Sequence, residues 1–330
     1  MAKVVCPKCG RPGYLVRVKV HNSYYMRVEH WENEKRYVCY LGKDVNELRR
    51  QLEEVIGRGG AKVLRMPGGN YKIADVLLSR LERLCPRPRC TLVEVFGGSG
   101  YVSQMANRAV YGNIIYNDIN NMLTTIYRYV KEHPEQLATL LALLPYSRAY
   151  YRIVRDLARV NQDFASLVTA ALFFYLYNTA FHGNVTRKGF AYSIDPAKNE
   201  ARAYRSRVLA IVRYAEVWKD VIIENLDFRQ VIKKYDGRRT VFYLDPPYPD
   251  RSKDYYGTAF TVDDLREMAT MLSRIRGRFL LKLDYRTYEL VKDLLPDSKY
   301  VVEVFERPLN MQRVKGGKRG RWLLTLVSNP

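Results

Sequence analysis

The sequence predicts an α/β domain preceded by a small β module, and three stretches lead to this fold class. Residues 91–96 form an apolar run that passes through a glycine-rich turn into a helical pattern. Residues 240–244 form a second apolar run, which ends at an acid and two prolines. Residues 14–41 instead contain three short segments separated by turn residues, as in antiparallel strands. The chain of 330 residues, 47% of them apolar, is long enough for one large core and a small appendage.

The charge of the chain restricts its partners. It contains 55 Lys and Arg against 34 Asp and Glu, a formal net charge of +21. This excess disfavours an enzyme for neutral metabolites and favours a polyanionic partner such as a nucleic acid. The alternative is a basic surface that serves solubility alone.

Composition also predicts the compartment. The longest apolar stretch, residues 167–181, is interrupted by Thr169, Asn178 and Thr179 and is too short to span a bilayer. No signal peptide is visible before Cys6. We therefore expect a cytoplasmic protein, whose five cysteines are metal ligands or thiols before disulfides. The scarcity of Gln and the abundance of Arg and Tyr favour a hot habitat.

The first forty residues predict a metal site. Cys6 and Cys9 stand two residues apart, a spacing that points two thiolates at one metal ion. We expect strands at residues 14–20, 24–31 and 36–41, with the first turn at 21–23. That turn would lie roughly 20 Å from the cysteine pair at about 3.3 Å per residue. His30 and Cys39 would instead return to the start of the first strand.

We therefore predict a structural zinc bound by Cys6, Cys9, His30 and Cys39 in a module that spans residues 1–43. The alternative is that only the first two cysteines are ligands. The module resembles small zinc-ribbon modules of archaeal proteins. Residues 44–60 are predicted to form a helix, opened by a capping box at Asp44 and Glu47, and a glycine-rich linker. The large domain would occupy residues 61–330.

Two glycine segments of the large domain predict a cofactor site. Gly68 and Gly69 precede a helix expected at residues 73–84, where backbone N–H groups can receive a carboxylate. Gly97–Gly100 follow the strand at 91–96, and Asp118 ends a second strand about twenty residues later, a spacing that suits a ribose. The turn is not G-x-G-x-x-G. A cofactor with one ribose and no phosphate is therefore favoured, and S-adenosylmethionine fits.

Asp245-Pro246-Pro247-Tyr248 follows the strand at 240–244 and predicts a site for an amine. Two prolines donate no backbone hydrogen bonds, so they form a stiff strand tip with free carbonyls. A carboxylate and a carbonyl can each accept one amine hydrogen, while the tyrosine ring stacks on a flat heterocycle. The alternative is an ordinary turn after a strand.

In combination and in this order, the motifs Pro67-Gly68-Gly69, Phe96–Gly100, Asn117-Asp118 and Asp245–Tyr248 resemble the Dam-type (D12 class) N6-adenine-specific DNA methyltransferases over residues 64–330. The resemblance implies a Rossmann-like class I methyltransferase domain. It implies catalytic roles for Asp245, Pro246, Pro247 and Tyr248. It implies S-adenosylmethionine contacts from Gly68, Gly69, Asn70, Phe96, Gly97, Gly98, Ser99, Gly100, Asp118, Asp227 and Phe228.

Two positions depart from the family pattern. Asn70 stands where the family usually has lysine, and the nearest lysine is Lys72. The loop of the family usually reads Phe-x-Gly-Ser-Gly with a small residue at x, a pattern that Gly97 fits loosely.

Residues 123–215 are predicted to form a mostly helical insertion that resembles the target-recognition region of the family, with helices at 123–130, 135–144, 146–160 and 164–181. Arginines recur at helical spacing at positions 148, 152, 155 and 159, as either a phosphate-binding face or a solvated one. A basic loop at 313–321 precedes the last strand at 322–327. The residues expected to contact nucleic acid are Lys72, Asn178, Arg187, Lys188, Arg313, Lys315, Lys318 and Arg319.

The expected activity is transfer of a methyl group from S-adenosylmethionine to adenine N6 of a flipped-out base in double-stranded DNA. We expect a monomer with a possible cognate restriction nuclease. Methylation of cytosine N4 or of RNA adenine is an alternative, because the tetrapeptide can serve any flat amine. A non-catalytic nucleic-acid-binding protein is a second alternative, which a test of cofactor binding would distinguish.

Overall fold

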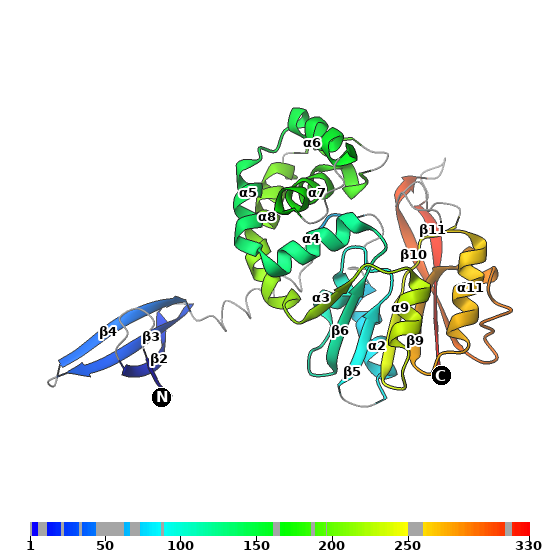
Figure 1. Ribbon diagram of the computed structural model, residues 1–330, viewed down its shortest axis with the longest axis horizontal. Helices are drawn as coiled ribbons and strands as arrows, with labels where there is room; N and C mark the ends of the chain where they lie inside the picture. The colour runs from blue at the N-terminus through cyan, green and yellow to red at the C-terminus, as the bar shows by residue number, and fades with distance from the viewer. Residues whose placement is uncertain are drawn as a thin grey trace. The chain divides into compact units, whose positions relative to one another are not determined.

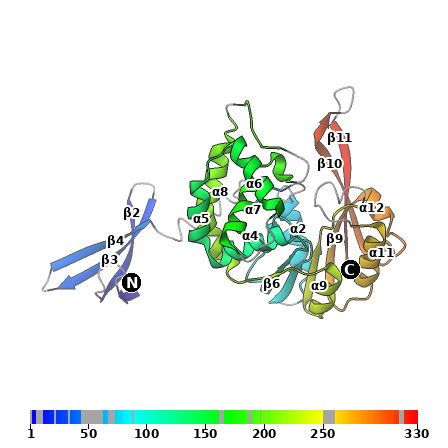
Figure 2. The ribbon, with the colours of Figure 1, turned by 45° about the horizontal axis from the view of Figure 1, so that its top comes forward.

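The chain divides into two compact units, Met1–Ala61 and Lys62–Pro330, and each is described by itself. The computed structural model describes residues 2–5, 12–20, 23–32, 35–43, 63–66, 73–86, 89–160, 166–185, 189–195, 197–249, 260–313 and 319–330. Figures 1 and 2 show the ribbon from two directions. The predicted helix and linker at 44–60 lie outside the described residues.

The N-terminal unit contains an antiparallel four-stranded sheet of order β1-β2-β3-β4. Its strands are β1 (Ala2–Val5), β2 (Pro12–Val20), β3 (Ser23–Glu32) and β4 (Lys35–Lys43). The three predicted strands are confirmed, because β-branched and aromatic residues recur through each of them. β1 was not predicted, since its four residues are too few to show a period.

The large unit is built on a seven-stranded sheet of order β10-β11-β9-β8-β5-β6-β7. Strands β9, β8, β5, β6 and β7 are parallel, and the β10–β11 hairpin joins antiparallel to β9. The bounds are β5 Cys90–Glu94, β6 Tyr111–Asn117, β7 Val221–Glu224, β8 Thr240–Leu244, β9 Arg278–Asp284, β10 Val301–Arg313 and β11 Arg319–Ser328. The predicted α/β class with a mostly parallel sheet is confirmed.

Helices cover both faces of this sheet. On one face, α9 (Phe228–Tyr235), α11 (Val262–Leu272) and α12 (Tyr285–Glu289) pack on alternate residues of β5, β8 and β9 and form a continuous apolar core. On the other face lie α2 (Ala74–Leu84), which packs against β8 and β9, and the short α3 (Tyr101–Met105). Strands buried on both sides explain why β8 is almost entirely apolar and why β5 has an apolar centre, with the buried Glu94 at its end.

The predicted helical insertion is a bundle between β6 and β7 (Figure 1). Its helices are α4 (Asn121–Glu132), α5 (Pro134–Leu143), α6 (Arg148–Val160), α7 (Leu167–Thr179) and α8 (Glu200–Trp218), with a 3₁₀ turn, η2, at Phe181–Gly183. α7 is buried around most of its circumference and lies at the centre of the bundle, against α4, α5, α6 and α8. This explains its nearly uniform apolar sequence. No helix among the described residues is long and apolar enough to cross a membrane.

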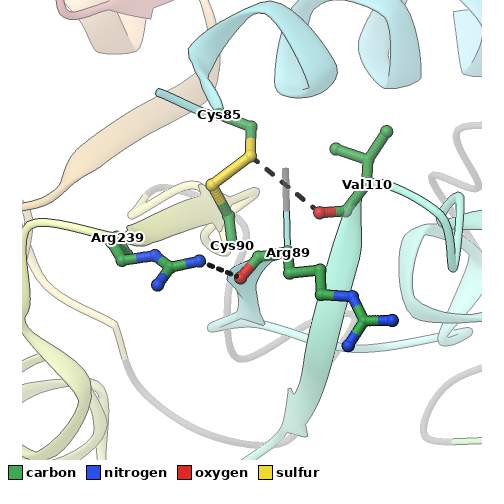
Figure 3. Close-up of a disulfide and its surroundings, with 5 residues drawn as sticks. All are labelled: Cys85, Arg89, Cys90, Val110 and Arg239. Atoms are coloured by element: carbon green, nitrogen blue, oxygen red, sulfur yellow. Dashed lines mark hydrogen bonds between the residues drawn. A yellow bond between two sulfur atoms is a disulfide. The ribbon is translucent and has the colours of Figure 1, made fainter. Parts of the chain in front are cut away.

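The expectation that the cysteines are thiols or metal ligands is wrong for Cys85 and Cys90. These two residues form a disulfide between the end of α2 and the start of β5 (Figure 3). The backbone beside it is held by Arg239, which donates to the carbonyl of Arg89, and by Val110, whose carbonyl accepts from the amide of Cys90.

Replacing Cys85 with serine is expected to lower the free energy of unfolding of the large unit by about 2 kcal/mol, because a short loop of unfolded chain is no longer closed. The bond joins residues only five apart, so the effect is modest. Urea denaturation with and without a thiol reductant measures it. Reductant should destabilise the native protein to the level of the variant and leave the variant unchanged; a native protein insensitive to reductant would contradict the bond.

Candidate active site

Four neighbouring parallel strands end at the same edge of the sheet, and each is followed by a predicted site segment. β5 leads to Phe96 and the glycine turn, β6 to Asp118, β7 to Asp227, and β8 to Asp245. Register places Glu94 beside Tyr116 and Tyr243, so these loops leave the sheet at one level. Ligands of open α/β sheets bind at this carboxyl edge.

The glycine turn fits closely against aromatic rings. A Cβ atom at Gly97 would overlap the ring of Tyr116, so a side chain there would require that ring to move. Gly98 and Gly100 have φ of +51° and +60°, the left-handed region that favours glycine. The hydroxyl of Tyr116 donates to the carbonyl of Gly98 at 2.9 Å, and that of Tyr127 to Ser99 at 2.6 Å. Two tyrosine hydroxyls therefore hold the carbonyls of the turn.

Asp118 is bonded to the same turn. Its carboxylate accepts from the backbone N–H of Gly98 at 2.7 Å and from that of Asn120 at 2.8 Å. Burial raises the pKa of Asp118 to about 6, although both hydrogen bonds act in the opposite direction. The group is thus ionised at neutral pH, with lone pairs left for further donors.

A buried asparagine ties three of the loops together. The side chain of Asn117 donates to the carbonyls of Val95 and Leu226 and accepts from the amide of Leu226. Asp227, immediately after, caps α9 with a capping box. Phe228 is buried, and its ring centroid lies 5.9 Å from that of Phe96. The segments predicted from Phe96, Asp118, Asp227 and Phe228 are therefore brought together.

Asn178, predicted to contact nucleic acid, has a different place. Its side chain is fully buried in α7, donates to the carbonyls of Val63 and Phe174, and accepts from the amide of Arg65. We correct this prediction: the amide is used inside the protein, where it anchors residues 63–66. The end of Met66 lies 3.9 Å from where a Cβ of Gly98 would be, so the anchored segment passes beside the glycine turn.

Lys282 on β9 is a site residue that sequence reasoning missed. Its ammonium group donates to both carboxylate oxygens of Asp245 at 2.7 Å. The lysine side chain is only 7% exposed and that of Asp245 20%. Leu244 on β8 is paired with Leu281 on β9, and the same register places the next two residues, Asp245 and Lys282, opposite each other. A lysine within an apolar strand was the available signal, because a buried charge requires a partner.

Glu94 is a second buried ionisable residue beneath this edge. Its carboxyl group accepts from the N–H of Ser103 at 2.8 Å and from its hydroxyl at 2.5 Å. Burial, with a smaller contribution from the charge of Asp245, raises the pKa of Glu94 to about 8. Along β5, β8 and β9, Glu94, Tyr243 and Lys282 alternate with the core residues and so lie on the opposite face from α9 and α11.

This pKa predicts how stability depends on pH. An unfolded glutamate loses its proton near its ordinary pKa of 4.5, whereas Glu94 in the folded protein keeps it up to about 8. The contribution to stability is therefore complete below pH 4.5 and is lost as pH rises to about 8, at up to roughly 1.4 kcal/mol per pH unit. Urea denaturation between pH 5.5 and 8 should show a steeper loss for the native protein than for Glu94→Gln. If the stability of both proteins fell equally with pH, the raised pKa of Glu94 would be contradicted.

Other predicted residues lie outside the described part of the chain or are described only by their backbone. Arg313 and Arg319 pair across the end of the β10–β11 hairpin, so strand covers part of the predicted basic loop. On α6, Arg148 lies over the rings of Phe190 and Tyr192, and Arg155 pairs with its neighbour Asp156. The predicted residues outside the described ranges are Cys6, Cys9, Gly68, Gly69, Asn70, Lys72, Arg187, Lys188, Lys315 and Lys318.

His30 and Cys39 lie on the same face of the N-terminal sheet. Cys39 is opposite Val28 and Tyr37 is opposite His30, so the two predicted zinc ligands are diagonal neighbours. His30 is buried and Cys39 partly buried. Within the described ranges, no group of three or more His, Cys, Asp or Glu residues could hold a metal ion.

Comparison with known proteins identifies the family of this chain. Residues 67–315 match the family described as D12 class N6 adenine-specific DNA methyltransferase. The type II methyltransferase M.MjaIII of Methanocaldococcus jannaschii is 25% identical over 248 residues, 69% of this chain and 82% of that protein. The type II methyltransferase M1.LlaDCHI of Lactococcus lactis is 27% identical over 193 residues, 56% of this chain and 66% of that protein.

Among solved structures, a precorrin-6y C5,15-methyltransferase from Geobacter metallireducens aligns with a TM-score of 0.36 and 12% identity, covering 82% of this chain and 99% of that one. The family match spans the glycine turn, the helical insertion and the Asp-Pro-Pro-Tyr tip. The protein belongs to the D12 class of N6-adenine-specific DNA methyltransferases.

Proposed function

We propose that Asp245 and the carbonyl of Pro246 accept the two amine hydrogens of the target adenine, while Tyr248 stacks on the base and Pro247 stiffens the tip. The enzyme methylates adenine N6 in DNA with S-adenosylmethionine as the donor. The observation that carries the assignment is the doubly bonded Asp245–Lys282 pair at the end of β8. It fixes the position of the carboxylate at the carboxyl edge of the sheet.

The glycine turn and its neighbours are proposed to bind the cofactor. Gly68, Gly69 and Asn70, with Phe96–Gly100, would contact the methionine end, Asp118 the ribose hydroxyls, and Asp227 and Phe228 the adenine. Support comes from the ionised Asp118, from the close approach that glycines permit, and from the ring contact between Phe96 and Phe228.

The chemistry then needs alignment more than acid or base strength. The N6 lone pair of adenine is delocalised into the ring, and hydrogen bonds to Asp245 and Pro246 draw the nitrogen towards tetrahedral geometry. The nitrogen forms a bond to the methyl carbon as the carbon–sulfur bond breaks, and N6 loses one proton, for which Asp245 is the proposed acceptor. Alignment of the two reactants can contribute on the order of 7–11 kcal/mol to the lowering of the barrier.

Contacts with the DNA backbone are proposed to offset the cost of extracting the base. Flipping costs a few kcal/mol, and stacking on Tyr248 returns roughly 1–3 kcal/mol. The remainder would come from phosphate contacts, which make binding fall steeply between about 50 and 200 mM salt. The basic residues proposed for these contacts are Lys72, Arg187, Lys188, Arg313, Lys315, Lys318 and Arg319.

Expression in a host without DNA methylation tests the assignment. Sequencing of the host genome should reveal N6-methyladenine in one sequence context, and none when Asp245 is replaced by alanine. Detection of methylation at cytosine N4, or of methylation in RNA only, would show that adenine in DNA is not the substrate. Cofactor binding without any methylation would favour the non-catalytic alternative.

We further propose that the N-terminal unit binds zinc through Cys6, Cys9, His30 and Cys39. Support comes from the diagonal placement of the buried His30 and the partly buried Cys39 on one face of the sheet. A small module gains on the order of 10–16 kcal/mol from such a metal. Metal analysis should find one zinc per chain and none in Cys39→Ser, with Cys85→Ser as the matched control. A folded N-terminal unit without metal would refute the site.

Sequence-specific methylation would protect DNA from a cognate restriction nuclease, and we propose such a partner because both related enzymes are named type II methyltransferases. We propose that the enzyme acts as a monomer. DNA from the expressing host should resist a nuclease that cuts at the methylated sequence. Sedimentation should give the mass of one chain.

A further inference from the structure

The N-terminal sheet has two unlike faces. On β3, Val28 and His30 are buried and face the same side as Cys39 on β4. Because side chains alternate along a strand, the intervening residues of β3 lie on the other side. Trp31 is on that other side, and its ring is 61% exposed.

The second face gathers aromatic rings from three adjacent strands. Tyr14 on β2 is opposite Glu29 on β3, and Trp31 and Arg27 on β3 are opposite Arg36 and Tyr40 on β4. Tyr14, Trp31 and Tyr40 are all exposed. We name the surface formed by Tyr14, Trp31, Arg36 and Tyr40 the aromatic face. Large rings left in water on one side of a sheet mark a binding surface.

The charge of this face selects its partner. Its central acid, Glu29, already pairs with Arg27 and lies 3.9 Å from a guanidinium nitrogen of Arg36. The acid is thus neutralised and one positive charge is left over. Residues 1–61 contain 12 Lys and Arg against 7 Asp and Glu. Exposed rings beside arginine are the combination that binds nucleic acid strands, through stacking on bases and contact with phosphates.

We propose that the aromatic face binds a DNA strand with unpaired bases, outside the methylation site. The rings of Tyr14, Trp31 and Tyr40 stack on bases, and Arg36 contacts a phosphate. DNA is the substrate of this enzyme, so the N-terminal unit would provide a second binding site for the same DNA molecule. The proposal does not depend on the roles assigned to Asp245 or to the glycine turn.

The test compares two exposed aromatic residues on opposite faces of the same sheet. Trp31→Ala removes a ring from the aromatic face, while Tyr37→Ala removes a ring that is 49% exposed on the face of His30. Affinity of the full chain for a fluorescent 20-nucleotide single strand is measured by anisotropy. Trp31→Ala is expected to weaken binding about tenfold, the loss of one stacked base, and Tyr37→Ala less than twofold.

Further measurements keep the result interpretable. Arg36→Gln, a variant of a side chain that is 51% exposed, should weaken the same binding and reduce its salt dependence. Zinc content and S-adenosylmethionine affinity should be unchanged in all three variants, which separates this surface from folding and from the cofactor site. Equal affinities of Trp31→Ala and Tyr37→Ala for the single strand, or a loss of duplex binding alone, would overturn the proposal.

Discussion

Replacing Asp245 with asparagine is expected to lower the rate of methyl transfer about a thousandfold while S-adenosylmethionine still binds, because the group removed acts on the reacting nitrogen. An amide offers one acceptor oxygen and one NH₂ group. Lys282 and the adenine amine are both donors, so the NH₂ of asparagine would face a donor in either orientation. Single-turnover kinetics and calorimetric titration of the cofactor measure the two effects separately.

The substitution also affects stability, and this must be separated from catalysis. Lys282 is almost completely buried, so the loss of its partner leaves an uncompensated charge at a cost of about 3–5 kcal/mol. The double variant Asp245→Asn with Lys282→Met removes both charges and should recover much of the stability. It should not recover activity.

A matched control is Asp293→Asn, which breaks the exposed pair between Asp293 and Arg266 far along the chain from the tip. Its activity and stability should stay close to those of the native enzyme, because exposed ion pairs contribute little. Methyl transfer restored in the double variant would show that Asp245 only balances the charge of Lys282. In that case its carboxylate would have no part in the reaction.

The strands that end at the site were predictable because local sequence describes them. Buried parallel strands are apolar on both faces, so β5 and β8 stand out as short apolar runs. Gly97 and Gly100 mark a turn for a physical reason that is also local, the absence of a Cβ. Four helices of the insertion follow from their apolar period, with ends that differ from the predicted ones by a few residues, whereas α8 was not predicted.

Contacts between distant segments were not predictable from the sequence. The pairing of Asp245 with Lys282 depends on β9 lying next to β8, and nothing in either strand encodes that neighbour. The burial of Asn178 depends on residues 63–66 entering the bundle more than a hundred residues away. Lysine and asparagine are both common at surfaces, so composition alone favoured water or a ligand as the partner of Lys282 and Asn178. The expectation for Cys85 and Cys90 was wrong because it relied on the expected compartment alone.

Replacing Gly100 with alanine is the second substitution expected to have a large effect. The residue has φ of +60°, and a Cβ there would lie 2.6 Å from the ring of Trp218. That ring stacks on Tyr127, with 4.1 Å between centroids, and Tyr127 bonds to the carbonyl of Ser99. We expect the free energy of unfolding to fall by about 2–5 kcal/mol, from backbone strain and overpacking together.

Cofactor binding should suffer as well. Displacement of Trp218 would also move the ring of Tyr127, which is bonded to the turn that carries Gly98 and Ser99. Affinity for S-adenosylmethionine is therefore expected to fall more than tenfold. Gly237→Ala is the control: its Cβ would meet only the hydroxyl of Thr240 at 3.6 Å, an ordinary contact. Urea denaturation and calorimetric titration compare the two variants. Equal cofactor affinity in both would contradict the role of the turn.

A second substitution can separate strain from collision. Trp218→Phe shortens the ring that Gly100→Ala would strike, and leaves the backbone angle unchanged. If the collision is the larger cost, the two substitutions together should destabilise less than the sum of their separate effects, with a coupling free energy of about 1 kcal/mol or more. Additive effects would assign the cost to the left-handed backbone. Glycine would then be required at this position for its conformation, whatever ring lies opposite.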